Sequence, residues 1–454
     1  MVIAIALIVL VVATVLFHFL SPWWFTPIAS NWDTVDSTVD VTFWVTGVVF
    51  VAVNLFMAYA IIRYRHRQDG TKSHKAHYEP ENKKLEWWLT GVTSVGIAAM
   101  LAPGLSVWAK FVDVPADASV VEVLGQQWAW TYRFPGKDGE LGASDARLIS
   151  VDNPFGMDPS DPVGQDDVLV ANPQLHLPID KPVKMLLRAK DVNHQFAVPQ
   201  FRMKMDMVPG MVTHFWVTPT RTGEFDVLCE QLCGVAHFAM RGRVVVNTQE
   251  DFNTWLAAQP TFEQTVTATK GDPVAGQALF ATCTACHGAQ AEGNRELNAP
   301  KLSGQSDWYL VRQLQSFKAG VRGAHEQDTY AKQMIPFASM LADDTAVKNV
   351  VAYIKSLPEV RPAASVVGDP MRGRKIYETC SACHGSTAKG IWSTNAPRLS
   401  NMSDWYMARQ LKNFRDGIRG GHPQDFHGSQ MRSMAKTLRD DTAIADLLDY
   451  VRTL

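Results

Sequence analysis

The chain has 454 residues, which is long enough for three or four domains. Its net charge is −2 and no strongly basic domain stands out, which argues against a nucleic-acid binder. Its six cysteines form three close pairs: Cys229/Cys233, Cys283/Cys286 and Cys380/Cys383. Secreted domains use such pairs as disulfides. Because the two later pairs are each followed by histidine, in the C-x-x-C-H pattern of haem c attachment, we expect cofactor sites instead.

The first 20 residues contain no Lys, Arg, Asp or Glu. About 20 apolar residues suffice to cross a bilayer. A cleaved signal peptide is the alternative, but the stretch lacks a basic start and its apolar run exceeds that of such peptides. We therefore expect a retained transmembrane helix at 1–20. A transmembrane hairpin is expected at 41–109, with spans from about Val41 to Ile62 and from about Leu85 to Trp108.

The connection between the two hairpin spans is basic. No Lys or Arg precedes it, and it contains seven: Arg63, Arg65, Arg67, Lys72, Lys75, Lys83 and Lys84. The positive-inside rule places this connection in the cytoplasm. The third span then delivers the rest of the chain to the outer, periplasmic side. We expect an anchored protein of a bacterial inner (plasma) membrane.

A β-rich region follows, from about residue 116 to residue 250. Short runs of β-branched and aromatic residues alternate there with Pro, Gly and Asp, as in SVVEVLG, KPVKMLLRA and MVTHFWVTP. Many short strands separated by turn residues predict a sandwich or a barrel.

The stretch CEQLCGVAHFAM at 229–240 offers a soft set of metal ligands. Its two thiols, imidazole and thioether favour copper over magnesium or calcium. A mononuclear blue-copper site needs only one cysteine, so the second suits two thiolates that bridge two copper ions. A distant loop could return one more histidine to this site. His194 is the candidate, and His176 and His214 are the alternatives.

Residues 271–357 and 368–454 are two copies of one unit. Four landmarks of the first copy recur 97 positions later without a gap: G-D-P, C-x-x-C-H, N-A-P and D-W-Y. Apolar residues recur at helical spacing, as in DWYLVRQLQSFKAGVRG. An internal repeat at a fixed offset indicates a tandem duplication, here of a mostly helical domain.

Each copy carries the residues that attach one haem c, which are two cysteines for thioether bonds and a histidine for the iron. Dithiol redox chemistry is the alternative, but thioredoxin-like motifs sit in a βαβ context that this region lacks. The two sets are Cys283, Cys286 and His287, and Cys380, Cys383 and His384.

A second axial ligand follows from the repeat. Met334 and Met431 are equivalent in the two copies and each follows a Gln, whereas the neighbouring methionines have no methionine counterpart. Methionine opposite histidine raises the haem potential and closes the iron to small ligands, which suits electron transfer. His325 and His422 are also equivalent and would give bis-histidine ligation instead.

Three motifs together resemble subunit II of the haem–copper cytochrome c oxidases: KDVNHQFAVP, MDMVPGM and CEQLCGVAHFAM. In that family a cupredoxin-like domain holds the dinuclear CuA centre. The ligands that the resemblance implies are His194, Cys229, the carbonyl of Gln231, Cys233, His237 and Met240. The family usually has Glu where Gln231 stands, and that carboxylate reaches a magnesium ion, so magnesium binding is uncertain here.

The same resemblance implies roles for two further residues. Trp128, in GQQWAW, matches the aromatic patch where relatives receive electrons, although strand packing would also explain it. Glu86 resembles a glutamate at the mouth of a proton channel, although the helix dipole also favours a carboxylate at a helix start. Asp191 could support His194 or cap a turn.

The sequence thus predicts a multidomain protein with N-terminal transmembrane α-helices, a cupredoxin-like β-sandwich and two all-α cytochrome c domains in tandem. The implied role is that of an oxidase subunit II that relays electrons to a subunit I holding haem a, haem a3 and CuB, beside a subunit III. Oxygen reduction and proton translocation would belong mainly to subunit I. The donor would be a soluble cytochrome or a quinol-oxidising complex. The alternatives are a CuA-type nitric-oxide reductase subunit and a stand-alone membrane-anchored electron carrier.

Overall fold

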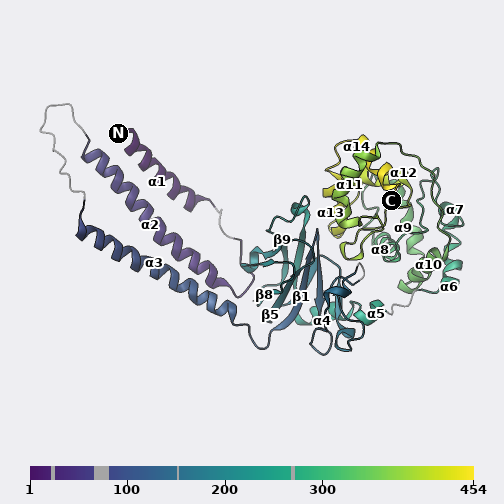
Figure 1. Ribbon diagram of the computed structural model, residues 1–454, viewed down its shortest axis with the longest axis horizontal. Helices are drawn as coiled ribbons and strands as arrows, with labels where there is room; N and C mark the ends of the chain where they lie inside the picture. The colour runs from purple at the N-terminus through teal and green to yellow at the C-terminus, as the bar shows by residue number, and fades with distance from the viewer. Residues whose placement is uncertain (22–25, 66–80, 151–152, 267–270) are drawn as a thin grey trace.

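The computed structural model describes residues 1–21, 26–65, 81–150, 153–266 and 271–454. Three parts follow one another along its long axis: a group of long helices at the N-terminus, a β domain, and a helical C-terminal part (Figure 1). The predicted fold class is confirmed.

Three long helices form the N-terminal part: α1 (Val2–Leu20), α2 (Asp33–Arg63) and α3 (Lys83–Val112). Each is long and apolar enough to cross a membrane, with mean hydropathies of 2.9, 2.3 and 1.6. Their large apolar side chains are exposed, which suits a lipid environment. Three of the predicted basic residues, Arg67, Lys72 and Lys75, lie outside the described residues.

Helix α2 begins eight residues before the predicted span, because its first turns stand outside the apolar stretch and contact the β domain. Asp36 accepts hydrogen bonds from Arg202 at 2.6 and 2.9 Å. The Trp32 indole donates to the carbonyl of Trp216 at 3.0 Å. These contacts join the anchor to the domain that follows it.

The β domain is a sandwich of two five-stranded sheets. One sheet has the order β3-β2-β1-β5-β8 and the other β4-β10-β9-β6-β7. Apolar side chains from both sheets form one buried core between them. The strands are β1 (Ser119–Gln126), β2 (Ala129–Phe134), β3 (Val168–Val170), β4 (Gln174–Pro178), β5 (Val183–Ala189), β6 (His194–Val198), β7 (Met203–Met207), β8 (Thr213–Val217), β9 (Gly223–Cys229) and β10 (Arg241–Asn247).

Two short helices, α4 (Gln249–Ala257) and α5 (Phe262–Val266), lead from the sandwich to the C-terminal part. The first helical unit contains α6 (Pro273–Phe280), α7 (Thr284–His287), α8 (Asp307–Lys318), α9 (Thr329–Ser339) and α10 (Asp344–Ser356). The second contains α11 (Pro370–His384), α12 (Asp404–Arg415), α13 (Phe426–Ala435) and α14 (Asp441–Val451).

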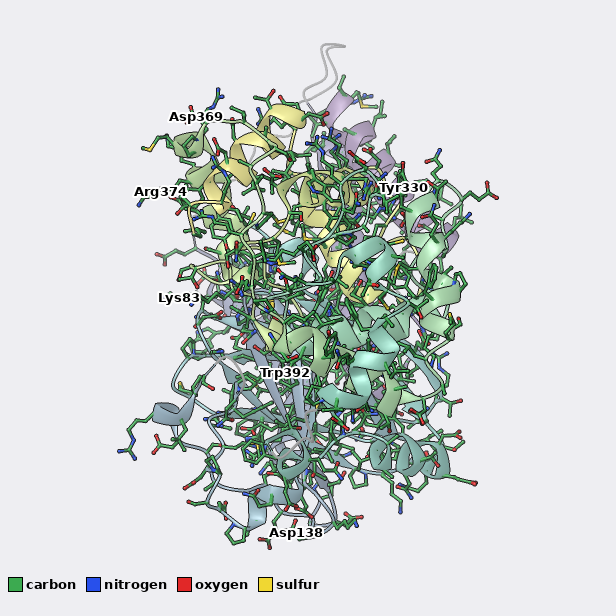
Figure 2. All side chains as sticks on the ribbon, turned by 90° about the vertical axis from the view of Figure 1, so that its right-hand side faces the viewer. Lys83, Asp138, Tyr330, Asp369, Arg374 and Trp392 are labelled. Atoms are coloured by element: carbon green, nitrogen blue, oxygen red, sulfur yellow. The ribbon has the colours of Figure 1, made fainter. Side chains whose placement is uncertain are left out.

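The two helical units repeat the same packing. A Cβ on Gly276 would overlap the backbone carbonyl of Asn349, and one on Gly373 would overlap that of Asp446. Only glycine therefore lets α6 approach α10, and α11 approach α14, this closely. Helix α11 is continuous where α6 and α7 are separate. Trp392, from the second unit, lies where the helical part meets the β domain (Figure 2).

Candidate functional site

The loop between β9 and β10 carries most of the predicted metal ligands. Strand β9 ends at Cys229, and β6 begins at His194. The two strands are antiparallel neighbours with Phe196 opposite Cys229, so His194 lies beside the thiols. The loop then contributes Cys233, and the short helix η4 (His237–Ala239) ends just before Met240. Local chain geometry thus gathers distant residues at one end of the sandwich.

Four side-chain contacts connect the predicted ligands. The Cys229 and Cys233 Sγ atoms are 3.7 Å apart, far longer than a disulfide bond. Cys229 Sγ lies 3.9 Å from the Nδ1 of His194. Cys233 Sγ lies 3.5 Å from the Nδ1 of His237 and 3.8 Å from the Sδ of Met240.

The sixth predicted ligand is a backbone carbonyl. The oxygen of Gln231 lies 3.3 Å from Cys229 Sγ, while its side chain is exposed. The structure therefore brings all six residues together, with two sulfur atoms at the centre. Such a donor set fits two soft metal ions.

Asp191 orients His194. Its carboxylate lies 2.8 Å from the Nε2 of His194, which leaves Nδ1 facing the thiols. Burial would lower the pKa of His194, but the hydrogen bonds to Asp191 and Cys229 and the charges of these two groups together outweigh it, so the pKa is raised. Burial would raise the pKa of Asp191, and the hydrogen bonds from His194 and from two backbone N–H groups outweigh it. A carboxylate behind a ligating imidazole fixes its tautomer and orientation.

The two thiols share one hydrogen bond. That bond lowers the pKa of Cys229 to about 3 and raises the pKa of Cys233. One thiolate therefore forms readily, and the second forms only when a cation compensates its charge.

The alternative histidines lie elsewhere. His176 stacks on Trp255 with ring centroids 4.1 Å apart and bonds to Asn247. His214 is exposed on β8. Among the described residues, the only group of three or more His, Cys, Asp or Glu side chains that could hold a metal is His194, Cys229 and Cys233.

Trp128 contacts the thiol loop directly. Its indole N–H donates to the carbonyl of Cys233 at 3.0 Å, and the side-chain amide of Gln127 donates to the same oxygen at 2.7 Å. Trp128 is 6% exposed. Glu86 is not part of this cluster, since it lies exposed in the first turn of α3, beside the Asn82 cap.

Each helical unit holds its C-x-x-C-H histidine in the same way. The Nδ1 of His287 lies 2.8 Å from the carbonyl of Pro300, and the Nδ1 of His384 lies 2.8 Å from that of Pro397. Burial lowers the pKa of both histidines, and the bond to proline only partly offsets it. Each imidazole is therefore neutral, with Nδ1–H donating and Nε2 available to a metal.

A cavity of about 1730 Å³ runs through both helical units. It exceeds the usual 300–1,000 Å³ of a single ligand pocket. Both C-x-x-C-H motifs line it, together with Met334 and Met431. His325 and His422 line a separate cavity of about 380 Å³. The methionines, and not these histidines, thus share a cavity with His287 and His384.

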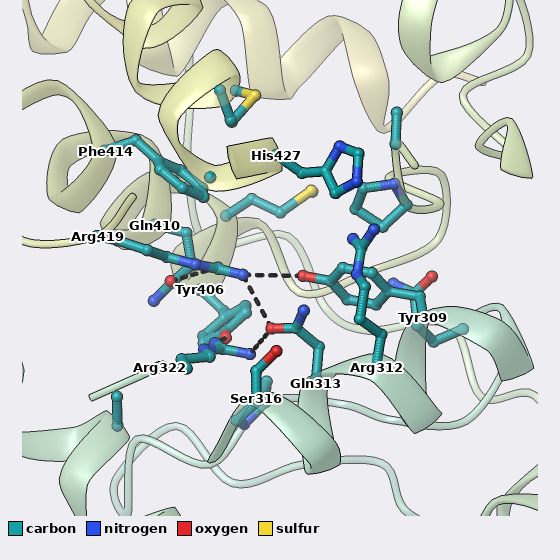
Figure 3. A pocket seen from close by; sticks show the side chains of 18 of the residues that line it. Tyr309, Arg312, Gln313, Ser316, Arg322, Tyr406, Gln410, Phe414, Arg419 and His427 are labelled. Carbon is teal, nitrogen blue, oxygen red and sulfur yellow. Dashed lines mark hydrogen bonds between the residues drawn. The ribbon is translucent and has the colours of Figure 1, made fainter. Parts of the chain in front are cut away.

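Reciprocal contacts join the two units around this cavity. Arg312 donates to the carbonyl of Asn395 at 3.0 Å, and its repeat equivalent Arg409 donates to that of Asn298 at 3.2 Å. Arg419 donates to the Tyr309 hydroxyl at 3.1 Å (Figure 3). The equivalent bond joins Arg322 to the Tyr406 hydroxyl. The units are therefore related by an approximate twofold arrangement.

Some of these residues were not predicted from the sequence. The proline carbonyls that orient both histidines had a usable signal, because the N-A-P triplet recurs at the same offset as C-x-x-C-H. Gln127 had none, since one amide side chain in the turn between β1 and β2 carries no pattern.

Comparison with known proteins assigns families to the β domain and to both helical units. The family model "Cytochrome C oxidase subunit II, periplasmic domain" matches residues 119–248, and the cytochrome c model matches 273–358 and 370–454. The alternative cytochrome c oxidase subunit 2 of Bradyrhizobium diazoefficiens is 59% identical over 262 residues, which are 58% of this chain and 93% of that relative.

Two further similar proteins each match part of the chain. Cytochrome c4 of Azotobacter vinelandii is 34% identical over 196 residues, which are 40% of this chain and 90% of that relative. The solved periplasmic domain of cytochrome oxidase subunit II from Bradyrhizobium japonicum is 27% identical, with a TM-score of 0.24, and the match covers 32% of this chain and 95% of that one.

Proposed function

The chain belongs to the cytochrome c oxidase subunit II family, and on that premise we propose that it relays electrons from two c-type haems through a dinuclear CuA centre to haem a of a subunit I. The observation that carries the proposal is the convergence of two cysteine sulfurs 3.7 Å apart with two imidazoles and a thioether. When bound, the copper pair and the haems accept and release one electron at a time.

The chain's own residues would hold these groups. The proposed copper ligands are His194, Cys229, the carbonyl of Gln231, Cys233, His237 and Met240. The cysteines and histidines of the two C-x-x-C-H motifs, with Met334 and Met431, are the proposed haem ligands. Rigid ligands suit electron transfer, because little needs to move when the charge changes. The β6–β9 pairing and the Asp191 carboxylate supply that rigidity here.

The position of the site also supports this role. The chain is membrane-anchored, and its family model describes a periplasmic domain. We propose the bacterial inner membrane as its location, and a complex with subunit I, holding haem a, haem a3 and CuB, and with subunit III. Glu86, at the opposite end of α3 from the sandwich, is the proposed mouth of a proton path.

The proposal is tested by measuring which gas, oxygen or nitric oxide, the purified complex reduces. With an electron-donating cytochrome present, we expect oxygen uptake that depends on the copper loop, and proton release when the complex is reconstituted in vesicles. Nitric-oxide turnover without oxygen uptake would contradict the oxidase assignment. Purification of the chain alone, without haem a, would favour a stand-alone carrier.

A further inference from the structure

The two proline carbonyls that orient the C-x-x-C-H histidines are each followed by a basic residue. Lys301 comes directly after Pro300, and its repeat equivalent Arg398 comes directly after Pro397. The side chain of Lys301 is fully buried, and that of Arg398 is 21% exposed. Burying a cation is costly unless a group of opposite charge compensates it. Lys301 in particular therefore needs an acidic partner.

Both basic side chains meet the same carboxylate, which belongs to Glu359 in the connection between the two helical units. Arg398 Nη2 lies 2.8 Å from the Oε1 of Glu359, and Lys301 Nζ lies 3.7 Å from the same oxygen. The side-chain amide of Asn401 also donates to this oxygen. Burial would raise the pKa of Glu359, but the hydrogen bonds and charges of these three residues together outweigh it and lower the pKa. Glu359 is therefore a charged link between equivalent loops of the two units.

The two loops also bond to each other's backbone. The side-chain amide of Gln305 donates to the carbonyl of Arg398 at 3.0 Å, and its oxygen accepts from the N–H of Arg398 at 3.2 Å. Lys301 donates to the carbonyl of Asn401 at 2.7 Å, and the Arg398 guanidinium donates to that of Gly304 at 2.9 Å. The segments that follow the two proline carbonyls are thus in direct contact. We refer to the five side chains that make these contacts as the Glu359 cluster: Lys301, Gln305, Glu359, Arg398 and Asn401.

Gly304 makes room for the carboxylate of this cluster. A Cβ at Gly304 would lie 2.7 Å from the carboxyl carbon of Glu359, and the φ of +79° there favours glycine. Asn401, the repeat equivalent of Gly304, has a similar φ of +58° and uses its side chain to bond Glu359. The two loops therefore share one backbone shape, and a single carboxylate fits between them.

A proline carbonyl can act on a haem iron through the histidine that it orients. When the Nδ1–H of a ligating imidazole donates to a carbonyl, the bond fixes the ring and raises the basicity of Nε2. A more basic ligand favours the oxidised iron, so this hydrogen bond sets part of the reduction potential. A group that holds the carbonyl in place therefore affects the iron.

We propose that Glu359 is a positioning residue for both haem c sites at once. Through Lys301 and Arg398 it holds the two proline carbonyls that orient the ligating histidines. The inference rests on the proposed function, since it takes both histidines to be haem ligands. It makes the two reduction potentials depend on one side chain, so one change in the connection between the units moves both in the same direction.

Each loop is also bonded to its own helical unit. The N–H of Leu302 donates to the carbonyl of Ala291, and the N–H of Leu399 donates to that of Ala388, both at 2.8 Å. Loss of the Glu359 cluster should therefore shift the reduction potentials without detaching either histidine.

Redox titration of both haems in the purified complex tests the proposal. Glu359→Gln should raise both reduction potentials, because both proline carbonyls lose part of their support. Removal of a negative charge would by itself also raise them, so a second variant separates the two causes. Lys301→Met removes a positive charge, which by itself would lower the potentials, whereas loss of positioning should raise the potential of the first haem.

Glu378→Gln is the control for charge, since Glu378 is exposed on α11 two residues before Cys380. It should change the potentials much less than Glu359→Gln does. Unchanged potentials in Glu359→Gln, or a lowered potential in Lys301→Met, would overturn the proposal. If Glu359→Gln does not fold, Glu359→Asp keeps the charge on a shorter side chain and should still raise both potentials; unchanged potentials there would overturn the proposal equally.

Haem quantitation on the same samples reports the proposed function separately. An unaltered chain without covalently attached haem would reject the proposed function. Two attached haems whose potentials do not respond to Glu359 would reject the inference alone.

Discussion

The two sulfur atoms of the loop between β9 and β10 have different surroundings. Cys229 lies between His194 and the carbonyl of Gln231, whereas Cys233 contacts His237 and Met240. Each thiol thus brings its own pair of further donors, and the short contact between the thiols joins the two halves. This division is what a site for two metal ions requires.

Replacing one thiol should affect the proposed copper site and leave the proposed haem sites intact. Cys233→Ser should abolish the mixed-valence dicopper spectrum, because a hydroxyl is a poor bridge between two soft ions. Both haems should stay attached, since their ligands lie in other domains. EPR spectroscopy with haem quantitation on the purified complex measures both. A dicopper spectrum that survives in the variant would show that the bridge is elsewhere.

The proposed ligation of haem iron by Met334 and Met431 can be tested in one repeat at a time. Met334→Ala should change the spectrum of one haem only and lower its reduction potential, because the thioether that favours the reduced iron is lost. Met340→Leu serves as the control, since Met340 is 66% exposed. Optical redox titration distinguishes the two haems. An unchanged titration of Met334→Ala would return the ligand role to His325.

At the scale of single elements, strand β2 carries a buried ionic cluster. Arg133 donates to Asp167 at 2.9 Å and to Glu122 at 3.1 Å, and all three side chains are buried. Burial raises the pKa of Asp167, and the Arg133 guanidinium opposes that rise. The arginine therefore offsets part of the cost of burying Asp167, while Glu122 also pairs with Arg188 at 2.8 Å.

Arg133→Met should destabilise the chain by about 3–5 kcal/mol, because it leaves the buried Asp167 carboxylate without a compensating charge, whereas Glu122 keeps Arg188. Arg147→Met is the matched control. Arg147 pairs with Asp145 at a position where the arginine side chain is 88% exposed, and such a pair contributes about 0–1 kcal/mol. Thermal unfolding of the purified complex compares the two variants. Equal losses of stability would contradict a structural role for the buried cluster.

Helix α12 begins with Asp404, a buried carboxylate whose repeat equivalent, Asp307 at the start of α8, is exposed. Asp404 accepts hydrogen bonds from the Ser365 hydroxyl at 2.6 Å and from the backbone N–H groups of Ser365 and Val366 at 2.7 and 2.9 Å. These bonds tie the connection between the two helical units to α12. Burial would raise the pKa of Asp404, and the hydrogen bonds outweigh it and lower the pKa.

A lowered pKa in the folded state fixes the direction of the pH dependence. The contribution of Asp404 is present above its unfolded pKa of about 4, and it is lost as the pH falls through the folded value. Asp404→Asn should lower the free energy of unfolding at neutral pH by roughly 1–3 kcal/mol. Below pH 4, the free energy of unfolding of the variant should fall less steeply with pH than that of the unaltered chain. Asp307→Asn, at the equivalent and exposed position, should do neither. Unfolding curves at several pH values measure both effects.

Much of the architecture was predictable from the sequence, for reasons that act locally. Apolar length indicates α1, α2 and α3, and helical spacing indicates the helices of both repeats. The fixed offset pairs Met334 with Met431, and both line the cavity that the two C-x-x-C-H motifs also line. The start of α2 was missed, because its polar first turns are stabilised by Arg202 of a distant domain, a contact that no local pattern reveals.

At the scale of the whole molecule, the sequence does not indicate how the domains meet. The contacts that seat the second helical unit on the sandwich involve Gln126, Ser393, Asn395 and Gln430, which are ordinary polar residues without spacing or repetition. The repeat even suggests that the two units are equivalent. Only the structure shows that Ser393 of the second unit is buried, whereas its repeat equivalent Glu296 is exposed.

The three parts of the chain follow one another in space in the order in which they occur in the sequence (Figure 1). The helices α1, α2 and α3 lead to the sandwich, and the helical C-terminal part lies on its other side (Figure 1). The second helical unit packs against the sandwich core. Holding the units in one chain keeps them at a high effective concentration, so transfer between them does not await diffusion.

The most direct test of this account is metal and haem quantitation of the purified complex, combined with its EPR spectrum. The account predicts two copper ions bound by this chain in a mixed-valence pair, with two covalently attached haems. A single mononuclear copper signal, or an intact dicopper signal after His194 is replaced, would contradict it.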